Sequence, residues 1–256
     1  MNCIDSIGPL GVLMYHAVQD DWRSPLAVPR AEFEAHCRWL QGRRLVLPLD
    51  DWLRRFDRGR LERSFTAITF DDGFRSVYEV AFPILRKYGL PATVFVVGGT
   101  LGAKRLPIDW TTGTPPAGLA TLSPDQISEM SSSRITFGSH GQTHRDLTTL
   151  SPSECERELI ESRAALEDVL GDAVGLFAYP LGTHNAAVRD AVERAGYGHA
   201  FGTSRGSDRV GRYAIPRAGV YPGDGVTTLR VKVSRWYLPV RRSPLFPLLR
   251  RAVRRS

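Results

Sequence analysis

Apolar and polar positions follow two alternating patterns along the chain. Short apolar stretches rich in β-branched residues alternate with longer stretches in which apolar residues recur at helical spacing. This alternation favours a mainly parallel α/β architecture, in which buried strands alternate with helices. The pattern predicts strands at residues 10–15, 65–70, 92–97, 134–137, 174–179 and 213–216, and helices at residues 30–42, 75–88, 124–130, 152–170 and 186–195.

The helix predicted at residues 152–170 has the strongest local signals. Ser151 precedes it as an N-cap, Pro152 suits the first helical position, and Glu154 stands where a capping box requires it. By contrast, residues 98–122 are rich in glycine and proline and lack periodicity. They predict a long loop, and loops of that length often border a functional site.

The length and charge of the chain define its expected organisation. A single α/β barrel commonly reaches 256 residues, and a composition of 42% hydrophobic and 24% charged residues is typical of a globular protein. The net charge of +7 is unevenly distributed, because the chain after Asp224 has nine Lys and Arg residues and no acidic one. We therefore expect one folded domain at residues 1–224 and a basic amphipathic tail at residues 225–256.

The basic tail indicates which class of partner the protein could bind. A nucleic-acid-binding surface would need basic residues across a folded face, so the sequence does not favour nucleic acid as a partner. Leucines, a phenylalanine and arginines alternate near the end of the chain, which fits peripheral contact with an anionic membrane surface. The alternative is a basic helix packed on the folded domain.

Cysteine usage and hydropathy bear on the location of the protein. The three cysteines, Cys3, Cys37 and Cys155, are odd in number and have no CxxC spacing, which argues against a disulfide framework or a zinc–thiolate site. The first ten residues lack the basic and apolar regions of a secretory signal, and no apolar stretch approaches the roughly 18 residues of a membrane span. The expected location is the cytoplasm, with the tail at the inner membrane surface.

The first candidate for chemistry is a pair of adjacent carboxylates. Asp71 and Asp72 directly follow a predicted strand, and Gly73 then turns the chain into a helix. Adjacent carboxylates repel each other, and burial increases the cost of ionising both, so a bound cation would stabilise them. One carboxylate can then bind a metal while its neighbour accepts a proton. The alternative is a solvated Asp-Asp-Gly turn with a structural role.

The second candidate is a pair of histidines in the sequence from Phe137 to His144. His140 and His144 follow another predicted strand and lie four residues apart, so a tight turn would bring both onto one cation. Imidazole suits zinc and neighbouring transition metals, and two imidazoles with one carboxylate leave positions open for water and substrate. The alternative is two unrelated loop histidines.

Two further segments place polar or aromatic residues after strands. Tyr179 ends the strand predicted at 174–179 and Pro180 follows it; they offer a hydroxyl or a ring to a sugar, or simply pack. His16 follows the first strand and is a candidate proton donor, or a structural histidine. Because strand C-terminal ends share one face in parallel α/β folds, we expect all these residues to meet in one site.

These residues resemble the motifs of the polysaccharide deacetylase family, also called the NodB-homology family. Residues Thr69 to Asp72 are similar to its first motif, and residues Ser139 to His144 to its second. The resemblance extends over roughly residues 8–222. It implies a distorted (β/α) barrel, a divalent metal that is usually Zn²⁺, with Co²⁺, Ni²⁺ or Mn²⁺ as alternatives, and deacetylation of N-acetylglucosamine-type glycans or acetylated xylan.

Carried over by position, the resemblance implies a role for each residue. Asp71 becomes the general base, and Asp72, His140 and His144 become the metal ligands. The segment from Met14 to Val18 resembles members in which a histidine near the N-terminus replaces a late-chain histidine as the general acid, as in biofilm poly-N-acetylglucosamine deacetylases. Residues 215–220 contain no histidine, which agrees with that replacement and assigns the acid to His16.

The chain departs from the family pattern in its third motif. The Arg that usually precedes the aromatic-Pro pair is absent, so its contact with the base is either missing or made from elsewhere in the chain, with Arg217 as the candidate. Arg217 is also a candidate substrate-binding residue. Asp109-Trp110 has the letters of the acidic Asp-Trp motif but lies in the long loop. Trp110 and Tyr179 are candidates for stacking on sugar rings.

Three alternative functions remain open from the sequence. The same metal site would serve an acetyl-xylan-type esterase or a small-amide hydrolase. A non-catalytic glycan-binding relative is a second alternative, against which the intact Asp71, Asp72, His140 and His144 argue. A nucleic-acid binder that uses the basic tail is the third.

Overall fold

A closed barrel of parallel strands forms the centre of the molecule. The computed structural model describes residues 11–43, 46–60, 65–102, 106–111, 114–203, 210–234 and 236–242. The barrel order is β1-β4-β5-β6-β7-β8-β9, and β1 closes it by pairing with β9 through Leu13 and Ala218. The expected (β/α) barrel is therefore confirmed. The barrel strands are β1 Gly11–Tyr15, β4 Thr66–Phe70, β5 Ala92–Val96, β6 Ile135–Ser139, β7 Leu176–Ala178, β8 His199–Thr203 and β9 Ile215–Gly219.

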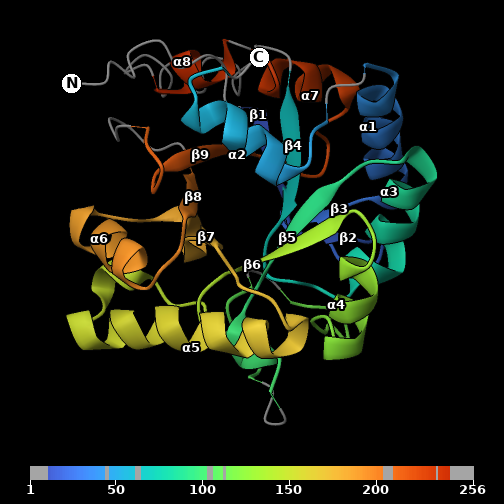
Figure 1. Ribbon diagram of the computed structural model, residues 1–256. Coiled ribbons are helices and arrows are strands. Elements are labelled where there is room, and N and C mark those ends of the chain that lie inside the picture. The colour runs from blue at the N-terminus through green and yellow to red at the C-terminus, as the bar shows by residue number, and fades with distance from the viewer. Residues whose placement is uncertain are drawn as a thin grey trace.

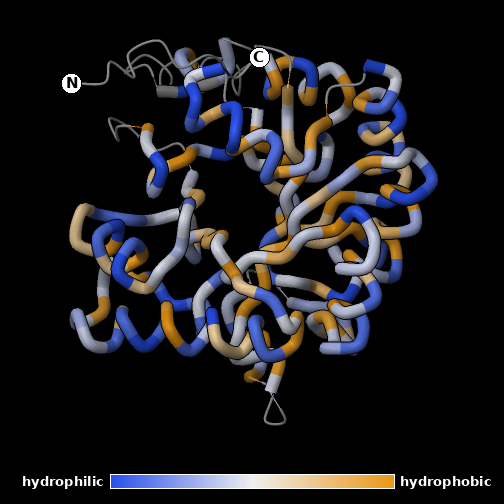
Figure 2. The backbone as a smooth tube through the Cα atoms, viewed as in Figure 1, coloured by the Kyte–Doolittle hydropathy of each residue, from blue (hydrophilic) through white to orange (hydrophobic). Residues whose placement is uncertain are grey.

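Helices cover the outside of the barrel, and a small separate sheet joins them (Figure 1). The sheet pairs β2 Ala17–Val18 with β3 Ala27–Val28. Figure 2 shows hydrophobic and hydrophilic residues alternating along the outer helices, as expected of helices with one buried face. The helices are α1 Arg30–Arg43, α2 Leu49–Asp57, η1 Val77–Ala81, α3 Phe82–Tyr88, η2 Gly98–Thr100, α4 Pro124–Ser131, η3 Leu147–Thr149, α5 Pro152–Leu170, η4 Pro180–Gly182, α6 Ala186–Arg194, α7 Val226–Lys232 and α8 Tyr237–Arg242.

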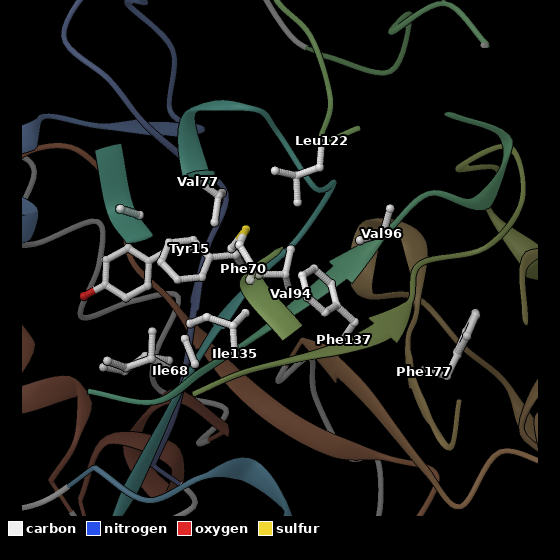
Figure 3. Close-up of a cluster of buried hydrophobic side chains, with 14 of the residues drawn as sticks. Tyr15, Ile68, Phe70, Val77, Val94, Val96, Leu122, Ile135, Phe137 and Phe177 are labelled. Carbon is white, nitrogen blue, oxygen red and sulfur yellow. The ribbon is translucent and has the colours of Figure 1, made fainter. Parts of the chain in front are cut away.

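Each barrel strand is buried on both faces, and successive residues alternate between two cores. Tyr15 and Phe70 belong to the core between the barrel and the helices, as Figure 3 shows. Val12 and Ala67, on the same two strands, belong to a second core that also contains Phe95 and Phe201 from β5 and β8. This alternation follows from the two-residue period of a strand. The parity of a residue therefore decides whether its side chain faces the barrel interior or the helices.

The structure confirms most predicted elements and adds several. Helix α5 has the predicted bounds, and its capping box pairs Ser151 with Glu154. The helix predicted at 75–88 divides into the π-helix η1 and α3. Strand β8 and helix α2 were not predicted: HAFGT is short with an interior glycine, and LDDWLRRFD is a helix of only 9 residues. Strand β8 depends on tertiary packing. Helix α2 does have a local signal that could have predicted it, because Leu49, Trp52, Leu53 and Phe56 recur at helical spacing.

The segment predicted as a tail begins as part of the fold. Helix α7 packs against α1, and its Leu229 is fully buried. Lys232 is also buried, where its ammonium group donates to Gly219 O and contacts Asp224. At least α7 therefore follows the packed alternative, whereas residues 243–256 lie outside the described part of the chain. Within the described residues, no helix is both long and apolar enough to cross a membrane.

Candidate metal and catalytic site

The carboxyl ends of four barrel strands bring the predicted residues together. Asp71 continues β4 and its N–H donates to Tyr15 O at the end of β1, directly before His16. His140 continues β6 and its N–H donates to Val96 O at the end of β5. Arg217 lies within β9 and reaches Asp71. Residues that are far apart in the chain thus meet at one end of the barrel, as expected for this architecture.

Three side chains form a set that can hold a metal ion. Ligand atoms of Asp72, His140 and His144 lie within 4.8 Å of one another, and all three residues are buried. Asp72 Oδ1 lies 3.2 Å from His144 Nε2 and 3.6 Å from His140 Nε2. His140 Nδ1 donates to Ala178 O over 2.8 Å, which leaves the lone pair of Nε2 facing Asp72. A buried acceptor facing another acceptor fits a site for a divalent cation.

Charge and burial favour the protonation states that a metal requires. Burial lowers the pKa of His140 to about 4, despite the opposing effect of the nearby carboxylates. Burial alone would raise the pKa of Asp72, but contact with His144 and the surrounding imidazoles outweighs it and lowers the pKa to about 2. A neutral imidazole and an ionised carboxylate are the forms that bind metal.

Two of the three candidate ligands have a left-handed backbone. Asp72 has a φ of 68° and His144 a φ of 58°, values that few non-glycine residues adopt. Such conformations cost free energy on the order of 1–3 kcal/mol and persist where neighbouring structure imposes them, often at functional sites. The strain at both residues is therefore a second, independent mark of a functional site.

Arg217 holds the second carboxylate. Its guanidinium donates from Nη1 to Asp71 Oδ1 over 2.6 Å and from Nη2 to Asp71 Oδ2 over 2.7 Å. Burial alone would raise the pKa of Asp71, but Arg217 and His140 together lower it, so the carboxylate stays ionised. Arg217 thus makes the contact expected of it in place of the absent third-motif Arg, and Asp71 Oδ2 lies 4.0 Å from His140 Nε2.

His16 and Trp110 border this set. His16 is half-buried, and its charge contributes to the low pKa values of Asp71 and Asp72. Trp110, from the predicted long loop, stacks on His144 with ring centroids 5.0 Å apart and planes 21° apart. The buried atoms His16 Nδ1 and Trp110 Nε1 have no hydrogen-bond partner among the described residues. Both side chains therefore offer unused polar groups beside the carboxylates.

The interpretation of Tyr179 and Pro180 as sugar contacts is wrong. Tyr179 is fully buried, and its hydroxyl donates to Tyr213 O over 2.8 Å. Leu176 and Ala178 of β7 face the barrel interior, so the strand alternation directs Tyr179 to the helix layer. Pro180 is also buried and packs close to Gly141. This motif supports the histidine loop from behind instead of contacting a substrate.

Sequence reasoning missed Leu181 and Glu158. Leu181 is 53% exposed and has a φ of 59°, so an apolar side chain is presented to solvent from a strained turn after β7. Glu158 of α5 is buried and accepts hydrogen bonds from the backbone of Gln142 and Thr143, between the two candidate histidines. A signal for Glu158 exists, because it is an acidic residue on the apolar stripe of α5 beside Leu159.

Comparisons with known proteins bear on the family of the chain. The family model for polysaccharide deacetylase matches residues 58–200. YxkH of Bacillus subtilis (strain 168), which is named as a polysaccharide deacetylase, is 31% identical over 218 residues, 84% of this chain and 72% of YxkH. The poly-beta-1,6-N-acetyl-D-glucosamine N-deacetylase of Staphylococcus aureus (strain MSSA476) is 27% identical over 206 residues, 75% of this chain and 67% of that protein.

A solved structure shows the same fold. The Streptococcus pyogenes deacetylase PplD in complex with acetate superposes with a TM-score of 0.77 over 90% of this chain and 100% of PplD, at 24% identity. The family model covers more than half of the 256 residues, and YxkH exceeds 30% identity over most of them. This chain therefore belongs to the polysaccharide deacetylase family of hydrolases.

Proposed function

We propose that the protein removes N-acetyl groups from an N-acetylglucosamine-type glycan, with a divalent metal bound by Asp72, His140 and His144. The observation that carries the proposal is the convergence of these three ligands within 4.8 Å beside an ionised Asp71. Deacetylation by relatives supports the reaction, and the printed name of the Staphylococcus aureus relative supports the glycan. Zn²⁺ suits one carboxylate and two imidazoles, and Co²⁺, Ni²⁺ and Mn²⁺ are the alternatives.

Each residue around the metal site has a separate role in the proposed reaction. A divalent metal, when bound, polarises the acetyl carbonyl and lowers the pKa of water. Asp71, held ionised by Arg217, accepts the proton of the attacking water at its carboxylate. His16 donates a proton to the departing amine nitrogen, which would otherwise be a very poor leaving group. The fixed ion pair keeps Asp71 oriented while it gains the proton.

Trp110 and Leu181 are the proposed contacts for the substrate. Trp110 covers His144 with its ring and carries an indole N–H without a partner among the described residues, so it can pack on the acetyl group or sugar and donate to an oxygen. Leu181 adds an exposed apolar side chain beyond the buried Tyr179-Pro180 pair. These two replace Tyr179 and Pro180 as the residues expected to affect KM.

Acetate release tests the proposed function. The protein, treated with a chelator and then loaded with Zn²⁺, Co²⁺, Ni²⁺ or Mn²⁺, is assayed on β-1,6-linked N-acetylglucosamine oligomers, chitooligosaccharides and acetyl-xylan. We expect metal-dependent release from an N-acetylated glycan. Release from acetyl-xylan alone would establish the esterase alternative. Metal uptake without release from any substrate would favour the glycan-binding alternative.

We also propose peripheral membrane contact through the C-terminal segment. Trp236 is 61% exposed and Val240, one helical turn later, is 44% exposed; no acidic residue follows Asp224 among the basic ones. Exposed apolar residues among cations suit an anionic lipid surface. Flotation with phosphatidylglycerol vesicles tests this membrane contact, with Ile160→Ser as the matched control for Trp236→Ser. Equal binding of the two variants to the vesicles would contradict the proposal. The cytoplasmic side of the membrane is the proposed location.

A further inference from the structure

The loop between the two candidate histidine ligands is held by a carboxylate from outside the motif. Glu158 Oε2 accepts from Gln142 N over 2.9 Å and from Thr143 N over 2.8 Å, and Oε1 accepts from the Thr143 hydroxyl. Glu158 is only 7% exposed and lies on α5, well outside the barrel strands. A buried carboxylate is costly unless donors compensate it, so this residue and these three donors form one unit.

The opposite side of the same loop is held by the backbone of η2. Gly98 N donates to Gly141 O and Gly99 N donates to Gln142 O, each over 2.9 Å. A Cβ on Gly99 would lie 2.6 Å from Gln142 O, so only glycine permits this approach. The loop is therefore clamped between η2 and Glu158, with hydrogen bonds on both sides.

This clamp accounts for the strained backbone of the next residue. His144, with its φ of 58°, immediately follows the two residues whose amides Glu158 binds. A non-glycine residue stays in that region where surrounding contacts over-determine it. If the bonds to Glu158 were lost, the loop would relax and His144 Nε2 would leave its position 3.2 Å from Asp72 Oδ1.

We infer that Glu158 is a positioning residue that sets the metal affinity of the site, by fixing the 141–143 loop so that His144 faces Asp72 and His140. The inference rests on the proposed metal site. Residues that orient metal ligands from behind typically change metal affinity about 10- to 100-fold when replaced. Glu158 acts through the backbone of the two residues before His144, whereas His140 is oriented through its ring nitrogen by Ala178 O.

Direct metal titration of matched variants tests the inference. Glu158→Gln turns one acceptor oxygen into a donor that faces backbone N–H groups, and we expect its Kd for Zn²⁺, measured by competition with a chromogenic chelator, to rise about 10- to 100-fold. Glu158→Asp keeps the charge, and its Kd for Zn²⁺ is expected to lie between that of Glu158→Gln and that of the unchanged protein. Glu161→Gln is the control, because it makes the same change at an exposed position of the same helix.

Amide hydrogen exchange provides a readout that does not depend on metal. In metal-free protein, the amides of Gln142 and Thr143 are expected to exchange faster in Glu158→Gln than in the control Glu161→Gln, while those of β6 keep their rates. If Glu158→Gln does not fold, Thr143→Val removes only the hydroxyl bond to Glu158 and is expected to raise the Kd by a smaller factor.

The outcomes separate this inference from the proposed function. The role of Glu158 would be overturned, and the metal site left intact, if the unchanged protein binds Zn²⁺ and folded Glu158→Gln binds it with the same Kd. If Glu158→Gln does not fold, the same Kd in Thr143→Val would overturn that role. Absence of uptake by the unchanged protein would overturn both. A higher Kd together with faster exchange at residues 142 and 143 would support the inference.

Discussion

The turns after β6 and β7 lie side by side in the barrel but serve opposite purposes. His140 follows β6 and points into the barrel mouth, where it meets Asp71 and Asp72. Tyr179 follows β7 and points outward, where its hydroxyl donates to Tyr213 O. The difference is one of parity, because successive strand residues face opposite sides. Where the backbone stays extended past the strand, a polar or aromatic side chain therefore reaches the site only if its parity directs it inward. Asp72 has the outward parity and reaches the site because its backbone is left-handed.

The same rule sorts the other residues of the site. Val12 and Ala67 face the barrel interior, and His16 and Asp71, which continue their strands at the same parity, reach the site. Ile215 faces inward as well, and Arg217 lies two residues after it. Tyr15, of the opposite parity, instead faces the Nδ1 atom of His36 on α1. We therefore expect Asp71 to control turnover, Arg217 to affect both turnover and stability, and the outward Tyr179 and Tyr15 to affect stability.

The largest effect is expected for the inward carboxylate Asp71. Asp71→Asn keeps the shape of the side chain but removes the proposed base, so kcat is expected to fall by about 10²–10⁴-fold. Bound metal, measured by elemental analysis, is expected to stay near the level of the unchanged protein, because Asp72, His140 and His144 remain. Full turnover in this variant would remove Asp71 from the role of base.

Replacing Arg217 is expected to affect stability and turnover together. Arg217→Met leaves Asp71 as a buried carboxylate without its bidentate partner, and breaking such a pair typically costs about 3–5 kcal/mol. Urea unfolding measures that loss of unfolding free energy. Arg217→Lys is the matched variant: it restores a charge but not the two-bond geometry, so it is expected to recover only part of the loss. Equal stability of all three proteins would contradict the role of the ion pair.

The outward Tyr179 is expected to affect stability alone. Tyr179→Phe keeps the buried ring and removes the hydroxyl bond to Tyr213 O, so unfolding free energy is expected to fall by about 1 kcal/mol. The kcat/KM for acetate release is expected to stay unchanged, since the side chain has no access to substrate. A fall in kcat/KM of more than about tenfold, with the fold intact, would break the parity argument.

The smallest effect is expected for the outward contact of Tyr15 with His36. His36 Nε2 donates to Asp224 O, so Nδ1 is the acceptor that faces the Tyr15 hydroxyl. Burial lowers the pKa of His36, although Glu32 and Asp224 oppose this and Lys232 adds to it. The folded state therefore binds a proton at His36 less readily than the unfolded state does. The contribution of neutral His36 to the unfolding free energy is fully present above about pH 6.5 and is lost as the pH falls further.

Unfolding at two pH values measures that contribution. Between pH 7.5 and pH 5.5, the unchanged protein is expected to lose more unfolding free energy than His36→Gln, which has no group to protonate there. An identical loss in the two proteins would show that His36 is not the group responsible.

The sequence by itself determined the mainly parallel α/β class, the capped helix α5 and the segments that carry the candidate metal ligands, and the resemblance of its motifs implied the barrel. These depend on short-range patterns: the period of apolar residues, a capping box over four residues, and motifs that directly follow strands. The parity that excludes Tyr179 was also present locally, but it could be applied only once the inward face of β7 was known.

Tertiary structure alone decided the partners that come from elsewhere in the chain. Arg217 lies 146 residues after Asp71. Glu158 stands out as an acidic residue on the apolar stripe of α5, but the sequence does not identify the loop that it binds. Strand β8 likewise depends on its pairing with β7 and β9, which no local pattern encodes. The physical reason is that these contacts form only in three dimensions. Closure of the barrel through the pairing of β1 with β9 brings Arg217 to Asp71, and packing of α5 against η2 and β6 brings Glu158 to its loop.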